Sequence, residues 1–177
     1  MSKTYNNQLI KAAAAGGNEE VRRFIPLADA CNNEALKAAI HNHNSVCVEM
    51  LLPVSDLSDV VEINGLLLWA VESLDAACVK LLIPVCNPKF NDSYPLQVAV
   101  LRGYTNILDA LFDASEPRAA LKCLQNFVES LGGGGEIEQR VAQFQERIEK
   151  CESQQQNKVL SEEVGGANNP VKCKQKM

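Results

Sequence analysis

Aromatic side chains are scarce in this chain of 177 residues: they make up 5% of it, although 46% of the residues are hydrophobic. Ala and Leu supply much of that fraction, which favours helices packed through small side chains. The chain also lacks a basic stripe interleaved with aromatic residues, and its formal net charge is −5. This combination argues against a nucleic-acid-binding surface.

Long hydrophobic runs are absent as well. No run approaches the ~18 apolar residues of a membrane span, and the first residues, MSKTYNNQLIK, contain no apolar signal core. We therefore expect a soluble, cytoplasmic protein with no membrane span. Delivery into a host cell by an unconventional secretion route stays open, because such a signal escapes this argument.

The seven cysteines form no CxxC pair. Their odd number and wide spacing, in a chain without a recognisable signal peptide, indicate reduced thiols rather than a disulfide framework. They are Cys31, Cys47, Cys78, Cys86, Cys123, Cys151 and Cys173.

Motifs of common catalytic sites are missing too. The chain contains no GxSxG, no HExxH and no phosphate-binding glycine loop, so we expect neither an enzyme nor a cofactor. One cluster has ligand or nucleophile chemistry, formed by Cys31, His41, His43 and Cys47. His41 and His43 are two residues apart at a helix end and point in different directions. A thiol/His-based metal-binding or small enzymatic protein is therefore kept as an alternative, and no metal site is predicted.

The stretch Tyr94–Glu116, YPLQVAVLRGYTNILDALFDASE, reads as two short helices joined by a turn. Three upstream segments align with it without gaps when they are superposed on one alanine, at spacings of 27, 31 and 29 residues. The aligned alanines are Ala12, Ala39, Ala70 and Ala99.

Each segment repeats the same chemistry after its alanine. Apolar residues at offsets of 9, 12 and 13 form one face of a second helix, and a proline at offset 14 ends that helix in three copies. At offset 4, between the helices, a turn residue is expected; Leu74 fits it least well. The turn residues are Gly16, His43, Leu74 and Gly103, and the residues at offset 14 are Pro26, Pro53, Pro84 and Asp113. The first helices are expected at about residues 7–15, 34–42, 65–73 and 95–102.

This pattern resembles that of ankyrin repeats, over about residues 8–116. The likeness rests on the helix lengths, the shared alanine, the apolar second helix and the opening Tyr94-Pro95-Leu96-Gln97. It departs from the family in its short spacings, since the family repeats every ~33 residues, and in its Leu/Ile-Pro endings. The resemblance implies an all-α helical repeat solenoid of about four degenerate helix-turn-helix units, and a protein-protein interaction scaffold without enzymatic activity.

The sequence from Glu116 onward predicts a capping helix, a glycine linker, a further helix and a disordered tail. Glu116-Pro117 begins a helix that completes a repeat stack over residues 1–131, and four glycines form a linker at 132–135. Residues 136–152 carry a helical apolar stripe, and residues 153–177 are expected to be disordered. The stripe consists of Ile137, Val141, Phe144, Ile148 and Cys151. It could fold back on the stack, or join a partner or a second copy, so weak self-association as a structural subunit remains an alternative.

An unknown protein partner is expected on the concave side, which first helices and their preceding loops build in such stacks. Trp69 stands out, because tryptophan is a favoured interface anchor, although it could instead pack between neighbouring first helices. The candidate partner-binding residues are Lys11, His41, Asn42, Trp69, Glu72, Ser73, Asn91, Asp92, Tyr94 and Arg102.

Overall fold

The computed structural model describes residues 2–28, 33–132 and 135–166, and this part of the chain contains helices and no strand. The all-α prediction is therefore confirmed. Cys31, the middle of the glycine linker and the tail beyond residue 166 lie outside the described residues. The helices are α1 (Ser2–Ala15), α2 (Asn18–Phe24), α3 (Glu34–His41), α4 (Ser45–Leu51), α5 (Val60–Glu72), α6 (Ala76–Leu82), α7 (Phe90–Arg102), α8 (Thr105–Phe112), α9 (Pro117–Ser130) and α10 (Gly135–Gly166), with a short 3-10 turn, η2 (Leu52–Val54), after α4.

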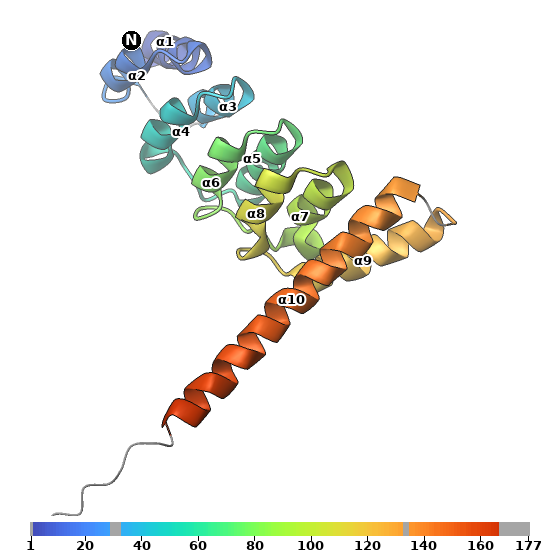
Figure 1. The fold of residues 1–177 in the computed structure, drawn as a ribbon. Coiled ribbons are helices and arrows are strands. Elements are labelled where there is room, and N and C mark those ends of the chain that lie inside the picture. Colours follow the sequence, from blue (N-terminus) through green and yellow to red (C-terminus); the bar gives the residue numbers. More distant parts are fainter. Residues whose placement is uncertain (1, 29–32, 133–134, 167–177) are drawn as a thin grey trace, which may run out of the picture.

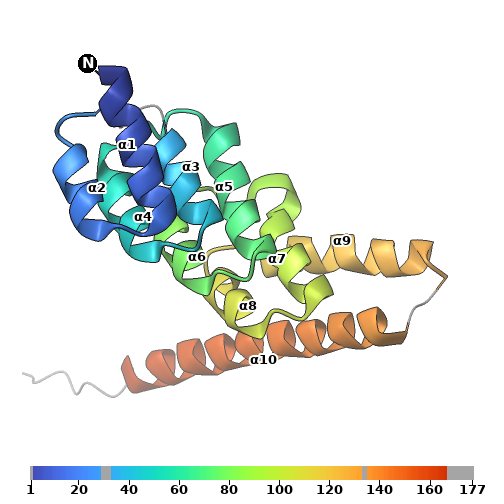
Figure 2. The same cartoon turned by 90° about the horizontal axis from the view of Figure 1, so that it is seen from above.

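The first eight helices form four antiparallel pairs that lie side by side (Figures 1 and 2). Helices α1, α3, α5 and α7 each contact the next one, and α9 continues this row beyond α7. The shorter helices α2, α4, α6 and α8 form a second row of successive contacts. The core lies between the two rows, where the aligned residues Val21, Val48 and Val79 are fully buried.

One turn recurs in all four pairs, at the position expected from the sequence. Its residue has a positive φ in every copy: 71° at Gly16, 60° at His43, 63° at Leu74 and 72° at Gly103. The backbone N–H of the following residue bonds to the carbonyl of the aligned alanine at 2.8–3.0 Å, as in Gly17 to Ala12. This is a Schellman ending, which satisfies the last carbonyls of the first helix.

The second helices end where the sequence predicts. In the three copies with a proline at offset 14, the last helical residues are Phe24, Leu51 and Leu82, all at offset 12. In the fourth copy Asp113 replaces the proline, and α8 continues one residue further, to Phe112. Proline therefore limits this helix as expected, since its ring clashes with the preceding helical turn.

Two first helices begin earlier than predicted, and a third is preceded by an irregular, left-handed opening. Helix α1 begins at Ser2, and α5 begins at Val60 because the Asp59 carboxylate accepts hydrogen bonds from the N–H groups of Val61 and Glu62, both at 3.0 Å. Such an N-cap stabilises a helix start. Helix α7 opens at Phe90, with Asn91, Asp92 and Ser93 at left-handed angles, so its regular part begins near Pro95.

Helices α9 and α10 form a hairpin that closes the row (Figure 2). The predicted stripe of α10 packs back on the chain: Val141, Phe144 and Ile148 are buried, and Phe144 meets the Phe112 ring edge-on at 6.1 Å. The guanidinium of Arg140 donates to the Leu101 carbonyl, and Arg147 donates to Asp109 at 2.6 Å. The apolar stripe that self-association would use is thus already covered within the chain.

Helix α10 is longer than expected, because it continues from residue 152 to Gly166 and projects beyond the helix pairs (Figure 1). The described side chains of residues 153–159 are exposed, so packing does not hold this segment. The helix continues because Gln, Glu and Lys have high helix propensity and residues 153–164 contain neither Gly nor Pro. The prediction of disorder is therefore wrong for residues 153–166, because a segment without a buried apolar face can still form a helix.

Leu74 provides a test of the recurring turn. Its side chain is 58% exposed, while its left-handed backbone is costly for any residue with a Cβ. We expect Leu74→Gly to raise the free energy of unfolding by roughly 0.5–1 kcal/mol, after the entropy cost of glycine is subtracted. The reverse change Gly103→Leu should destabilise, since a Cβ there meets Arg140 Cζ at 3.2 Å. Urea unfolding measures both, and a clear loss of stability in Leu74→Gly would contradict the strain.

Candidate functional site

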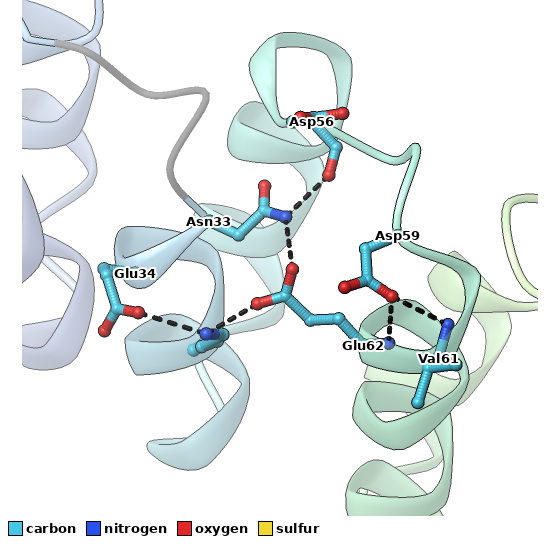
Figure 3. A network of polar contacts seen from close by, with 7 residues as sticks. Asn33, Glu34, Asp56, Asp59, Val61 and Glu62 are labelled. Atoms are coloured by element: carbon cyan, nitrogen blue, oxygen red, sulfur yellow. Dashed lines mark hydrogen bonds and ion pairs between the residues drawn. The ribbon is translucent and has the colours of Figure 1, made fainter.

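A polar network fixes α3 against α5 (Figure 3). The Lys37 ammonium contacts the Glu62 carboxylate at 2.6 Å and Glu34 at 3.0 Å. The side-chain amide of Asn33, which is 3% exposed, donates to the other Glu62 oxygen at 3.0 Å and to the Asp56 carbonyl at 2.6 Å. The Glu62 pKa is lowered, first by the hydrogen bond from Lys37 and then by that from Asn33.

A ring stack lies on the same two helices. His41 is one turn beyond Lys37 on α3, and Trp69 is two turns beyond Glu62 on α5. The ring centroids of His41 and Trp69 are 4.3 Å apart, with an interplanar angle of 34°. The indole nevertheless remains 44% exposed. Trp69 therefore packs against a residue of the neighbouring first helix and also keeps exposed surface, so the packing interpretation holds and the binding interpretation remains a prediction.

Other predicted residues divide into exposed groups and helix caps. Lys11, Glu72 and Arg102 are exposed on α1, α5 and α7. By contrast, the Asn42 amide donates to the Ala38 carbonyl at 2.8 Å, and the Ser73 hydroxyl donates to the Trp69 carbonyl at 2.8 Å. Both side chains bond to a carbonyl at the C-terminal end of their own helix, so their role in the structure is to cap that helix.

The candidate residues at the start of α7 are exposed, but they lie at the opposite end of this helix from Arg102. Asn91 and Asp92 form the left-handed opening of α7, and Tyr94, which is 37% exposed, follows it. Eight residues separate Tyr94 from Arg102, or about 12 Å along a helix. The structure therefore brings His41 and Trp69 into contact and leaves these three residues at the other end of α7.

Sequence reasoning missed a set of buried polar side chains, each six residues before an aligned alanine. Asn33 donates to the Asp56 carbonyl, the Asn64 side-chain oxygen accepts from the Asn87 N–H at 2.9 Å, and the Ser93 hydroxyl accepts from the Glu116 N–H at 2.9 Å. Each bond spans 23 residues and ties the start of a first helix to the segment after its own second helix. The signal is present in the sequence, since Asn6, Asn33, Asn64 and Ser93 align with one another. They precede the shared alanine, at which the aligned region of the repeats begins.

A second missed set joins neighbouring pairs at the recurring turn. The Asn44 amide donates to the Ala13 and Ala14 carbonyls at the end of α1, at 2.7 and 2.9 Å. The Asp75 carboxylate lies 3.3 Å from His43 Nδ1 in the preceding turn. At the last turn Arg140 of α10 takes this place, because it bonds to the Leu101 carbonyl and covers Gly103. Helix α10 thus bonds to the end of the first helix of the fourth pair, as Asn44 of the second pair bonds to the end of α1.

The alternative His/Cys cluster separates in the structure. His41 stacks on Trp69 and His43 faces Asp75, while the buried Cys47 thiol donates to the Asn18 side chain at 3.3 Å. No group of three potential metal ligands occurs among the described residues, and Cys31 lies outside them. Burial raises the pKa of Cys47, and it raises those of Cys78 and Cys86 to about 12. Thiols of this kind are poor nucleophiles at neutral pH.

Comparison with known proteins gives no relative: no family model matches the chain, and neither the curated proteins nor the solved structures show a significant match. Within the described ranges, none of the helices is long and apolar enough to cross a membrane. The function must therefore be argued from the surface itself.

The network predicts a pH dependence of stability. A carboxyl whose pKa is lower in the folded than in the unfolded state stabilises the fold above its unfolded pKa, and this contribution is lost as the pH falls through the folded pKa. We expect Glu62→Gln to unfold more easily than the wild type near pH 7, and the difference to be smaller at a pH well below the unfolded glutamate pKa of about 4.3, because the wild-type Glu62 is protonated as the pH falls through its lowered folded pKa. Urea unfolding at both pH values measures this, and an unchanged difference would contradict the assigned role of Glu62.

The two buried thiols and the half-buried Cys86 thiol predict slow alkylation. With iodoacetamide near pH 8, Cys47, Cys78 and Cys86 should react at least about tenfold more slowly in the native protein than in urea, because the thiolate is rare and enclosed. Mass spectrometry of each cysteine-containing peptide gives the rates. A native rate equal to the unfolded rate at any of the three would restore the thiol-based alternative.

Proposed function

We propose that the chain is a non-enzymatic protein-binding scaffold, built as a stack of ankyrin-like helix pairs that holds a partner protein on the concave face of its first helices. Three regularities support the repeat architecture: the Schellman turn in four pairs, the bonds spanning 23 residues in three, and the ordered contacts between successive helices. Stacked units of this kind expose a continuous surface along one row of helices.

The observation that carries the proposal is the exposed Trp69 ring, supported from one side by His41. A large aromatic ring that is ordered before binding loses little conformational entropy on association, and tryptophan is enriched among residues that dominate binding energy. The Lys37–Glu62 pair and Asn33 hold the two helices in place beneath it. Lys11, Glu72 and Arg102 supply charges along the same row, which suit orientation of a partner.

Two substitutions test this surface. Trp69→Ala and Arg102→Glu should leave the fold intact, because both side chains are exposed, and should lower capture of the partner from native lysate by about fivefold or more. Affinity capture with quantitative mass spectrometry compares each variant with the wild type, and circular dichroism checks the fold.

Matched controls come from other surfaces. Phe127 on α9 is also 44% exposed, and Lys80 is an exposed basic residue on α6. Phe127→Ala and Lys80→Glu should retain the partner. If Trp69→Ala and Arg102→Glu retain it equally well, the first-helix surface is not where the partner binds.

A further inference from the structure

A carboxylate lies beside the exposed tryptophan. Glu72 is three residues after Trp69 on α5, and residues at this spacing are neighbours on a helix surface. Its side chain is exposed, and within the described ranges it takes part in none of the ion pairs. Glu62, at the other end of α5, is neutralised by Lys37, and Asp59 caps the helix. Glu72 is therefore the carboxylate of α5 that is available to a ligand.

The tryptophan ring has one supported face. The His41 ring lies against that side, with the ring centroids 4.3 Å apart, and Trp69 as a whole remains 44% exposed, so part of its surface is accessible to a ligand. The open π face of an indole attracts cations, most strongly the planar guanidinium of arginine. An unpaired carboxylate next to such a face adds a charged acceptor for the same cation. A net charge of −5 also favours the approach of a cationic partner.

We propose that Trp69 and Glu72 form a cradle for a cationic side chain, arginine or lysine, of the partner protein. This inference rests on the proposed function, because it names the chemistry that the partner presents to the same surface. Lys11 and Arg102 are the basic groups of this row, but they lie on α1 and α7, so the carboxylate that shares α5 with the ring selects the charge bound there. Arg102 then favours an acidic group elsewhere on the partner, because like charges at an interface are unfavourable.

The single tryptophan makes the cradle directly observable. In ¹⁵N-labelled protein the indole N–H of Trp69 gives one resolved signal, which reports on titration with Nα-acetyl-arginine amide. Nα-acetyl-citrulline amide is the matched neutral probe, since it keeps the planar end group and removes the charge. We expect a saturable shift with the arginine probe, at concentrations of roughly 1–100 mM, as befits a single small contact, and no saturable shift with citrulline.

Two variants separate the cradle from general attraction. Glu72→Gln should weaken arginine binding by roughly twofold to fivefold, the range of an exposed ion pair, and should leave the Trp69–His41 stack in place. Glu49→Gln removes an exposed carboxylate of α4 instead and should leave binding unchanged. Equal shifts with both probes, equal weakening by both variants, or no shift at all would each overturn the cationic cradle.

The capture experiment keeps this result distinct from the proposed function. If Trp69→Ala loses the protein partner but the arginine probe produces no shift, the scaffold function stands and the assigned partner chemistry is wrong. If the arginine probe binds but Trp69→Ala keeps the partner, the cradle is a local site and the scaffold surface lies elsewhere.

Discussion

The backbone hydrogen bond that closes each left-handed turn is the constraint on which the rest of the structure depends. It joins the residue after the turn to the carbonyl of an aligned alanine, and so fixes where the first helix stops and the second begins. Because the turn is the same in four places, the second helix leaves the first through the same backbone conformation in every pair. Leu74 shows how strong this requirement is: a bulky exposed residue adopts a conformation that its own sterics oppose.

The sequence predicted what depends on local chemistry. The turn positions and the helix ends before Pro26, Pro53 and Pro84 follow from residue type and spacing, and the structure has them there. The spacing also marked the apolar stripe of α10 but left open what covers it, and the structure packs it on the chain's own helices. Helix starts were less predictable, because an N-cap such as Asp59 adds turns that apolar periodicity does not mark. The exposed half of α10 was missed for a related reason, since its helix carries no buried face.

The candidate surface was predictable only in part. Residue type and register identified Trp69, His41, Glu72 and Arg102, whereas contacts between helices were needed to show that His41 supports the indole. The same contacts assign Asn42 and Ser73 to helix ends. The Lys37–Glu62 pair beneath the rings could not be predicted, because it depends on where α5 begins and on how its first turn packs against α3. The contacts that hold this surface together therefore arise from packing between helices that no single segment encodes.

The bonds that span 23 residues also determine where the chain tolerates a change of length. They hold the second, third and fourth helix pairs at one internal size, although the aligned alanines of these pairs, Ala39, Ala70 and Ala99, are 31 and 29 residues apart. All of that variation must fall in the connectors, such as residues 57–63 between Asp56 and Asn64, where α5 gained its extra turn. The part of this connector that precedes the Asp59 cap, at the exposed Ser58, is thus the natural position for inserting a sequence, such as a label or a second binding loop, without altering the registration of the pairs on either side.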